Sequence, residues 1–303
     1  MPMIWRTVTT IHQQPRRIAG LYGSLGNPLG RQDVVEIIES HQPDRLRPNH
    51  LPTVGAVCHD RKMVTTSIQR VELDGGSMDL HVWTPTVPPT AAIIVIQEIF
   101  GVGEYIRAVA MRLAEAGYLV GAPDVFWRFA PGWQSDHSVE GLTASLGNAQ
   151  QLDVPQAISD CVAAAQQLSH GLQADADGAT MPAGVIGFCL GGTLAWGVAA
   201  NGQPSVCVSY YGSGVPSMLG LIDQVDCPTL FHFGSKDAYI PSEGVEAVSA
   251  AIANRPGFVL NVESAGHAFD NHCSDMFYDQ PAAQAAWAKT MAFLTSALPA
   301  SLQ

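Results

Sequence analysis

Short apolar runs alternate with segments of helical periodicity over most of the chain, and this alternation constrains its fold most strongly. The runs 91–97 (AAIIVIQ) and 183–188 (AGVIGF) are short and contain almost no polar residues. Such runs are typical of strands that are buried on both faces of a parallel sheet. Residues 104–117 and 154–170 have the apolar spacing of amphipathic helices. The sequence therefore predicts an α/β fold with a mostly parallel central sheet and helices on both faces.

The rest of the chain after residue 63 continues this alternation. Two strand-like segments, 64–74 and 77–85, flank an Asp-Gly-Gly turn and predict a β-hairpin. The same patterns predict further strands at 118–123, 205–212, 228–234 and 258–263. They predict further helices at 190–201, 243–253 and 282–298.

The first part of the chain differs from the rest. Residues 1–62 are rich in Pro, Asn and basic residues and contain one helix-like piece at 31–41. We expect an N-terminal extension, irregular or wrapped over the core, followed by a single α/β domain at 63–303. The twin arginine within 16–30 is followed by glycines instead of an apolar core, so we do not interpret it as a signal peptide.

Composition excludes several classes of partner. The net charge of −12 and the pI near 5.1 argue against nucleic acid and anionic membranes as partners. No apolar run approaches the roughly 20 residues of a membrane-spanning helix. The 6 cysteines have no paired spacing, which favours a reducing compartment. We therefore predict a cytoplasmic protein that acts on a small molecule.

Four reactive side chains follow four of the predicted strands. Glu98 follows 91–97, Cys189 follows 183–188, and the last two strands are followed by Asp237 and His267. Because the carboxyl ends of parallel strands meet at one edge of a sheet, we expect these groups to lie close together. The order of nucleophile, acid and histidine is that of the α/β-hydrolase fold, with cysteine in place of the serine of G-x-S-x-G.

Each of these residues also has a simpler structural interpretation. Cys189 could be a small core side chain, Asp237 part of a loop, His267 a structural histidine and Glu98 a surface carboxylate. However, all four stand at strand ends in the order that catalysis requires. The helix predicted after Cys189 also directs its free N–H groups at the sulfur, which favours the thiolate. We therefore expect a catalytic site.

Five motifs carry a resemblance to a known family, namely QEIFG (97–101), APDVFWR (122–128), GFCLGG (187–192), FGSKDAYIP (233–241) and GHAF (266–269). With these motifs, residues 63–303 resemble the dienelactone hydrolase family of α/β-hydrolases. The resemblance implies hydrolysis of a lactone or ester through an acyl-thioester. It implies Cys189 as nucleophile, His267 as base and acid, and Asp237 as the residue that orients His267.

The resemblance implies further roles around this triad. Glu98 would interact with the resting thiol, and its displacement by substrate would help to generate the thiolate. The backbone N–H groups of Ile99 and Leu190 would form the oxyanion hole. No cofactor or metal is implied. The neighbouring His267, His272 and Cys273 lack a recognisable spacing of metal ligands, so we predict no metal site there.

Substrate recognition is less clearly encoded. The resemblance places Arg128 where the family binds a substrate carboxylate, although a solvated loop arginine is the alternative. The family's second arginine, four residues after the histidine, is Asn271 here, and Asp270 precedes it. This loss weakens the expectation of an anionic substrate. Nearby aromatic residues could form a pocket or ordinary packing, and they are Phe100, Tyr105, Trp127, Phe129 and Trp133.

Two alternatives to a dienelactone hydrolase-like enzyme stay open. The missing arginine favours a carboxylesterase or thioesterase of broad specificity. A protein of a different class would be a non-catalytic member that uses Cys189 as a redox-sensitive or ligand-binding thiol. Release of product from an activated ester distinguishes an enzyme from such a protein.

Overall fold

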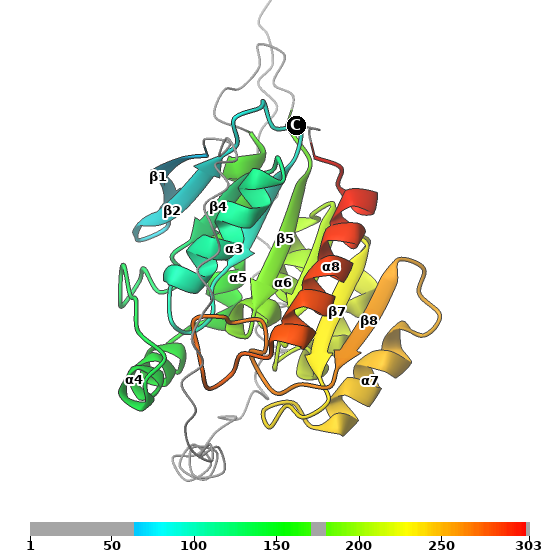
Figure 1. Ribbon diagram of the computed structural model, residues 1–303. Helices are drawn as coiled ribbons and strands as arrows, with labels where there is room; N and C mark the ends of the chain where they lie inside the picture. The colour runs from blue at the N-terminus through cyan, green and yellow to red at the C-terminus, as the bar shows by residue number, and fades with distance from the viewer. Residues whose placement is uncertain (1–63, 171–179, 301–303) are drawn as a thin grey trace, which may run out of the picture.

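The computed structural model describes residues 64–170 and 180–300 of the 303-residue chain (Figure 1). The predicted N-terminal extension at 1–62 and the helix-like piece at 31–41 lie outside the described residues. The boundary between this extension and the α/β domain therefore stays a prediction.

The centre of the domain is an eight-stranded sheet with the order β1-β2-β4-β3-β5-β6-β7-β8. β1 and β2 form the predicted antiparallel hairpin, β2 is antiparallel to β4, and the strands from β4 to β8 along the sheet are parallel. The mostly parallel sheet expected from the apolar runs is confirmed. The strands are β1 (Thr65–Leu73), β2 (Gly76–Thr84), β3 (Ala92–Ile96), β4 (Leu119–Pro123), β5 (Ala183–Phe188), β6 (Val206–Tyr210), β7 (Thr229–Gly234) and β8 (Phe258–Glu263).

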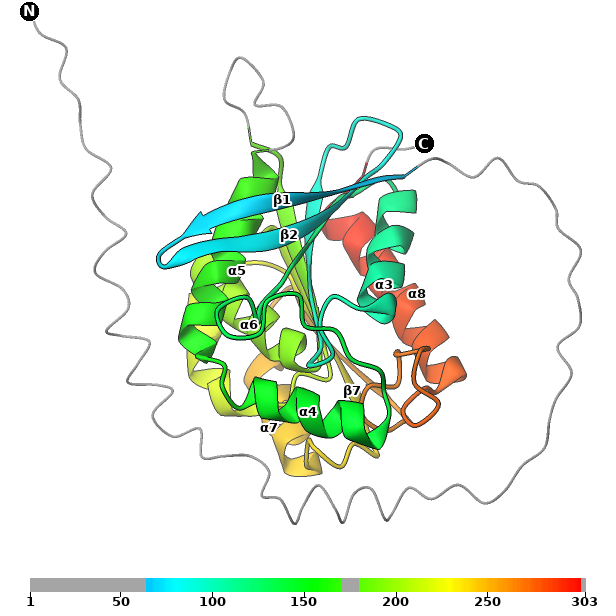
Figure 2. The same ribbon diagram turned by 90° about the vertical axis from the view of Figure 1, so that its left-hand side faces the viewer.

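Helices cover both faces of this sheet, as predicted. Figure 2 shows α3 and α8 on one face and α5 and α6 on the other. Every residue of β3, β4, β6 and β7 is buried between these layers, which explains why their sequences are almost entirely apolar. The helices are α3 (Glu104–Glu115), α4 (Val139–Ala149), α5 (Val154–Ser169), α6 (Leu190–Gly202), α7 (Ser242–Ile252) and α8 (Gln280–Ala297), with a 3₁₀ segment η1 (Pro216–Gln224).

The sequence did not predict α4 or η1. α4 contains two glycines, which weaken a helical pattern, but the side chain of Ser138 caps its first turn by accepting a hydrogen bond from the Gly141 amide. Leu142 of α4 packs with Ile99 and Phe100 in a small cluster of buried residues. α4 therefore supports the segment that follows β3, where Glu98 lies.

The carboxyl ends of the parallel strands lie at one edge of the sheet, at the bottom in Figure 1. β3 and β5 are paired in register there, with Ile96 opposite Gly187. The segments that carry Glu98 and Cys189 consequently leave neighbouring strands side by side. Among the described residues, no helix combines the length and the apolar character needed to cross a membrane.

Candidate active site

Cys189 occupies a strained turn between β5 and α6. Its φ of 54° and ψ of −115° lie in a region that residues with a side chain rarely adopt. Its amide is fixed by a hydrogen bond of 3.0 Å to the carbonyl oxygen of Tyr210. This turn places the side chain of Cys189 at the N-terminus of α6.

The glycines on either side of Cys189 are required by close backbone contacts. A Cβ atom on Gly187 would lie 1.8 Å from the carbonyl oxygen of Gly191, and one on Gly191 would lie 2.2 Å from that of Ile96. Neither position can accept a side chain without moving backbone. The G-x-C-x-G pattern therefore has a local steric cause.

The structure brings Cys189, His267 and Asp237 together as the sequence predicted. His267 Nε2 lies 3.1 Å from Cys189 Sγ, and His267 Nδ1 lies 2.7 Å from Asp237 Oδ2. Asp237 follows β7 and His267 follows β8. The other carboxylate oxygen of Asp237 accepts the Tyr239 amide at 2.8 Å, which fixes the carboxylate. An imidazole that donates from Nδ1 to Asp237 has Nε2 free to accept the thiol proton.

The surroundings of His267 favour its protonated form. Burial lowers its pKa, but the opposing negative charges of Cys189 and Asp237 and their hydrogen bonds raise that pKa well above the ordinary value. The side chains of His267 and Asp237 are 9% and 0% exposed. The rings of Tyr211 and Tyr239 lie 5.2 Å and 4.8 Å from the imidazole and limit its movement. The arrangement can therefore hold an imidazolium beside a thiolate.

Glu98 is buried beside this group of residues, but its hydrogen bond goes elsewhere. Its Oε2 accepts a hydrogen bond of 2.7 Å from Asn271 Nδ2, whereas the thiol of Cys189 is paired with His267. The contact between Glu98 and the resting thiol that the family resemblance implies is thus replaced in this structure by two other pairs. Burial raises the pKa of Glu98 to about 7, although the positive charge of His267 and the Asn271 amide lower it in part.

Asn271 connects Glu98 to a loop that the sequence analysis did not single out. Its Nδ2 also lies 2.9 Å from Nε2 of His137, and its Oδ1 accepts the Cys273 amide at 3.0 Å. The preceding Asp270 is buried and accepts a hydrogen bond of 2.7 Å from the Tyr105 hydroxyl. His137 was missed because it follows no strand and belongs to no motif, and it meets Asn271 only in the folded chain.

The two predicted oxyanion-hole amides follow the neighbouring strands β3 and β5. Leu190 is the first residue of α6, where backbone N–H groups have no partner within the helix. Ile99 directly follows Glu98 and is 8% exposed. Their position is consistent with a pair of donors next to Cys189, and this role stays a prediction.

Arg128 is not placed with the other predicted site residues. Its Nε and Nη2 donate to the two carboxylate oxygens of Asp160 at 3.0 Å and 2.9 Å, and its Nη1 donates to the Asp74 carbonyl oxygen at 2.8 Å. Its guanidinium also lies 4.2 Å from the centre of the Trp127 ring. All three nitrogens of Arg128 thus bind within the protein and tie α5 to the turn between β1 and β2. A contact of Arg128 with a substrate carboxylate stays a prediction.

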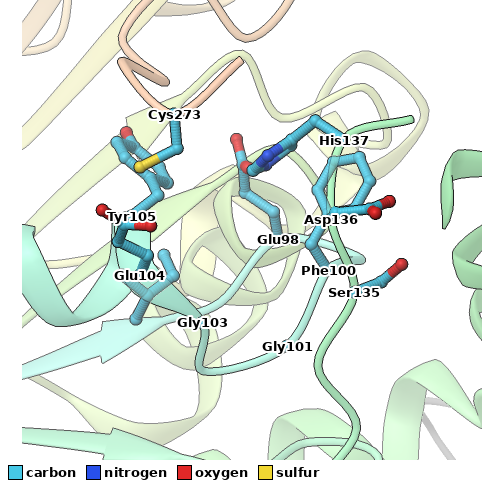
Figure 3. A pocket seen from close by; sticks show the side chains of 11 residues that line it. Glu98, Phe100, Gly101, Gly103, Glu104, Tyr105, Ser135, Asp136, His137 and Cys273 are labelled. Atoms are coloured by element: carbon cyan, nitrogen blue, oxygen red, sulfur yellow. The ribbon is translucent and has the colours of Figure 1, made fainter.

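A cavity of about 200 Å³ adjoins the site at Glu98 (Figure 3). Phe100 and Tyr105, two of the aromatic residues suggested by the sequence, line it. Trp127 instead donates to Asp160, and Trp133 donates to Ser145. In residues 64–170 and 180–300, no group of three or more His, Cys, Asp or Glu side chains is arranged to hold a metal ion.

The fold and the site together define an α/β-hydrolase. The reasons are a mostly parallel sheet of eight strands, a strained turn with a potential nucleophile after β5, and a carboxylate and a histidine after β7 and β8.

Comparison with known proteins identifies the family. The model of the Dienelactone hydrolase family matches residues 78–298, and the chain belongs to this family. It is 32% identical over 238 residues to the carboxymethylenebutenolidase of Pseudomonas sp. (strain P51), covering 78% of this chain and 98% of that protein. It is 29% identical to carboxymethylenebutenolidase 1 of Cupriavidus pinatubonensis over 77% of this chain and 97% of that one.

A solved structure gives the same result. The crystal structure of a putative dienelactone hydrolase from Klebsiella pneumoniae subsp. pneumoniae matches with a TM-score of 0.64 and 27% identity, covering 77% of this chain and 99% of that chain. The protein is therefore a hydrolase that acts on ester or lactone bonds of small molecules, as predicted.

Proposed function

We propose that Cys189 is the nucleophile of this hydrolase and that the reaction passes through an acyl-thioester. The observation that carries the proposal is the continuous contact from Asp237 through His267 to Cys189 at a strained turn. A thiolate attacks an ester carbonyl readily, and a histidine oriented by a carboxylate can move the required proton.

In the first half of the reaction, His267 takes the proton from Cys189 Sγ and the sulfur bonds to the carbonyl carbon of the substrate. The negative charge moves to the carbonyl oxygen, where the amides of Ile99 and Leu190 donate hydrogen bonds to it. The bond between the carbon and the alkoxy oxygen then breaks, and the leaving oxygen takes the proton from His267.

In the second half, His267 removes a proton from water as the water oxygen attacks the thioester. The carbon–sulfur bond breaks, the carboxylic product leaves, and the proton on His267 restores the starting state of the Cys189–His267 pair. Glu98 assists both halves of the reaction because its ionised form stabilises the nearby imidazolium of His267. The same attraction is the reason that the positive charge of His267 lowers the pKa of Glu98.

The decisive experiment follows p-nitrophenyl acetate hydrolysis with intact-mass measurement. We expect the wild-type protein to release one equivalent of p-nitrophenol in a burst and to carry one acetyl group transiently, whereas Cys189→Ala does neither. Cys273→Ala is the matched control, because Cys273 is a partly buried thiol that lines the adjoining cavity. An acetyl group that persists in Cys189→Ala and disappears in Cys273→Ala would refute the assignment.

The same assay separates the alternatives. A protein that only binds ligand or responds to oxidation through Cys189 shows no turnover with any ester. A carboxylesterase or thioesterase of broad specificity hydrolyses simple esters at least as well as lactones. Two observations favour the broad enzyme, because Asn271 stands where the family pattern has an arginine and Arg128 is bound to Asp160.

We also propose that the protein acts in the cytoplasm and on small molecules without a nucleic-acid partner. The five cysteines of the described residues are free thiols, which supports a reducing compartment, and they are Cys161, Cys189, Cys207, Cys227 and Cys273. The net charge of −12 supports the second part, because it opposes binding to polyanions.

A further inference from the structure

The cavity beside Glu98 is formed by three segments that meet at the carboxyl edge of the sheet (Figure 3). Seven lining residues come from the segment between Glu98 and Ile106, three from residues 135–137, and the last is Cys273. The cavity shares Glu98 with the proposed active site and therefore adjoins it.

The charged groups around this cavity are acidic. Glu104 and Asp136 are exposed at its rim, Glu98 lies inside, and the lining contains neither Lys nor Arg. Hydrogen bonds from Ser138 lower the pKa of Asp136, so this carboxylate is negatively charged at neutral pH. Burial and then the charges of Glu104 and Glu98 raise the pKa of the Cys273 thiol, which indicates that the negative potential extends across the cavity.

A second observation indicates that the cavity is built for a ligand. Glu98 is only 2% exposed and lines the cavity, and its Oε1 has no hydrogen-bond partner. The Tyr211 hydroxyl lowers the pKa of Glu98 through hydrogen bonding, but it also lies 3.3 Å from the Tyr105 hydroxyl and makes no well-formed hydrogen bond with Oε1. A buried carboxylate oxygen without a partner is costly, and a positive group in the cavity would compensate it.

The aromatic lining suits the same kind of group. Phe100 and Tyr105 line the cavity, and the His137 ring lies 4.3 Å from that of Phe100. Aromatic faces attract alkylammonium groups, most strongly where water is excluded. Asn271, the residue in the family's arginine position, adds no positive charge and uses its amide to hold Glu98 and His137.

We infer that this cavity is a subsite for a positively charged alkylammonium group of the substrate. The inference rests on the proposed function, because it assigns the substrate class of the same site. It predicts that the enzyme prefers cationic over neutral esters of equal size and neutral over anionic ones.

Binding is tested with three probes of nearly identical shape and different charge. These are choline, its neutral isostere 3,3-dimethyl-1-butanol, and 3,3-dimethylbutanoate as the anion. Each has a single intense methyl signal, so its affinity is measured by NMR titration with the wild-type protein at constant ionic strength and slightly alkaline pH. We expect choline to bind roughly ten-fold more tightly than the neutral isostere, and the anion to bind most weakly.

Variants at the rim test the cause of the preference. Glu104→Gln and Asp136→Asn keep the size of the side chains, and each is expected to weaken choline binding about two- to five-fold while leaving the neutral isostere unchanged. Glu246→Gln is the matched control, because Glu246 is an exposed carboxylate on α7, outside the cavity lining. Glu246→Gln also removes one negative charge, and we expect it to leave the affinity for choline unchanged.

The same probes are then used as inhibitors of p-nitrophenyl acetate hydrolysis, where choline should compete with substrate. Equal binding of choline and its isostere, tighter binding of the anion, or an equal effect of Glu246→Gln and the rim variants would overturn the subsite. A protein that binds choline selectively but hydrolyses no ester retains the subsite and refutes the proposed function, so the two failures are distinguishable.

Discussion

The buried carboxyl group of Glu98 should make the stability of the protein depend on pH, and Glu98→Gln should remove this dependence. Burial raises the pKa of Glu98 from 4.5 to about 7 in the folded protein. The folded state therefore holds this proton more tightly than the unfolded state does. The resulting stability is fully present below the unfolded pKa, decreases as the pH rises between the two values, and is lost above the folded one.

The size of the effect follows from these two pKa values. Between about pH 5 and about pH 8, ionisation of Glu98 should lower the free energy of unfolding by about 2.5 kcal/mol relative to a side chain that does not titrate. Any change in the free energy of unfolding that the glutamine side chain causes independently of pH cancels, because the same variant is compared at both pH values. For a domain of this size the difference corresponds to roughly 5–10 °C in Tm.

The assay is thermal or urea unfolding of the wild-type protein and Glu98→Gln at both pH values. We expect the stability of Glu98→Gln relative to the wild type to increase by this amount from the lower to the higher pH. Glu246→Gln, which removes an exposed carboxylate, should show no such increase. An unchanged difference between Glu98→Gln and the wild type would refute the idea that a desolvated carboxylate is present at this position.

Three further predictions concern the turn, the triad and Arg128. Gly191→Ala should destabilise the protein by several kcal/mol and abolish hydrolysis in any folded fraction, because its Cβ would lie 2.2 Å from a backbone oxygen; unchanged unfolding and activity would contradict this. Asp237→Ala and His267→Ala should each reduce kcat by orders of magnitude, and the double variant should be little worse than the worse single variant; additive losses would separate the two residues. Arg128→Ala should lower the free energy of unfolding by about 3 kcal/mol, because it leaves the buried Asp160 carboxylate without its cation, while kcat/KM for anionic and neutral esters changes in equal proportion. A selective loss for anionic esters would instead return Arg128 to the binding site.

The sequence by itself determined the strands, most of the helices and the place of the reactive residues. Apolar runs such as 91–97 and 183–188 are recognised as buried strands because a parallel sheet covered on both faces leaves few positions for polar side chains. The glycines around Cys189 are visible in the sequence because the close approach of two backbone segments excludes any side chain there. Such constraints are local, so the sequence alone carries them.

Only the tertiary structure decided which polar groups are paired. The partner of Glu98 is Asn271, which is 173 residues away, and Asn271 in turn meets His137 across 134 residues. Arg128 is similarly paired with Asp160 of α5. These contacts are between loops and helices that lie far apart along the chain, and no periodicity or motif records them. The charge and shape of the cavity depend on these pairings, and the inference about its ligand required the folded chain for that reason.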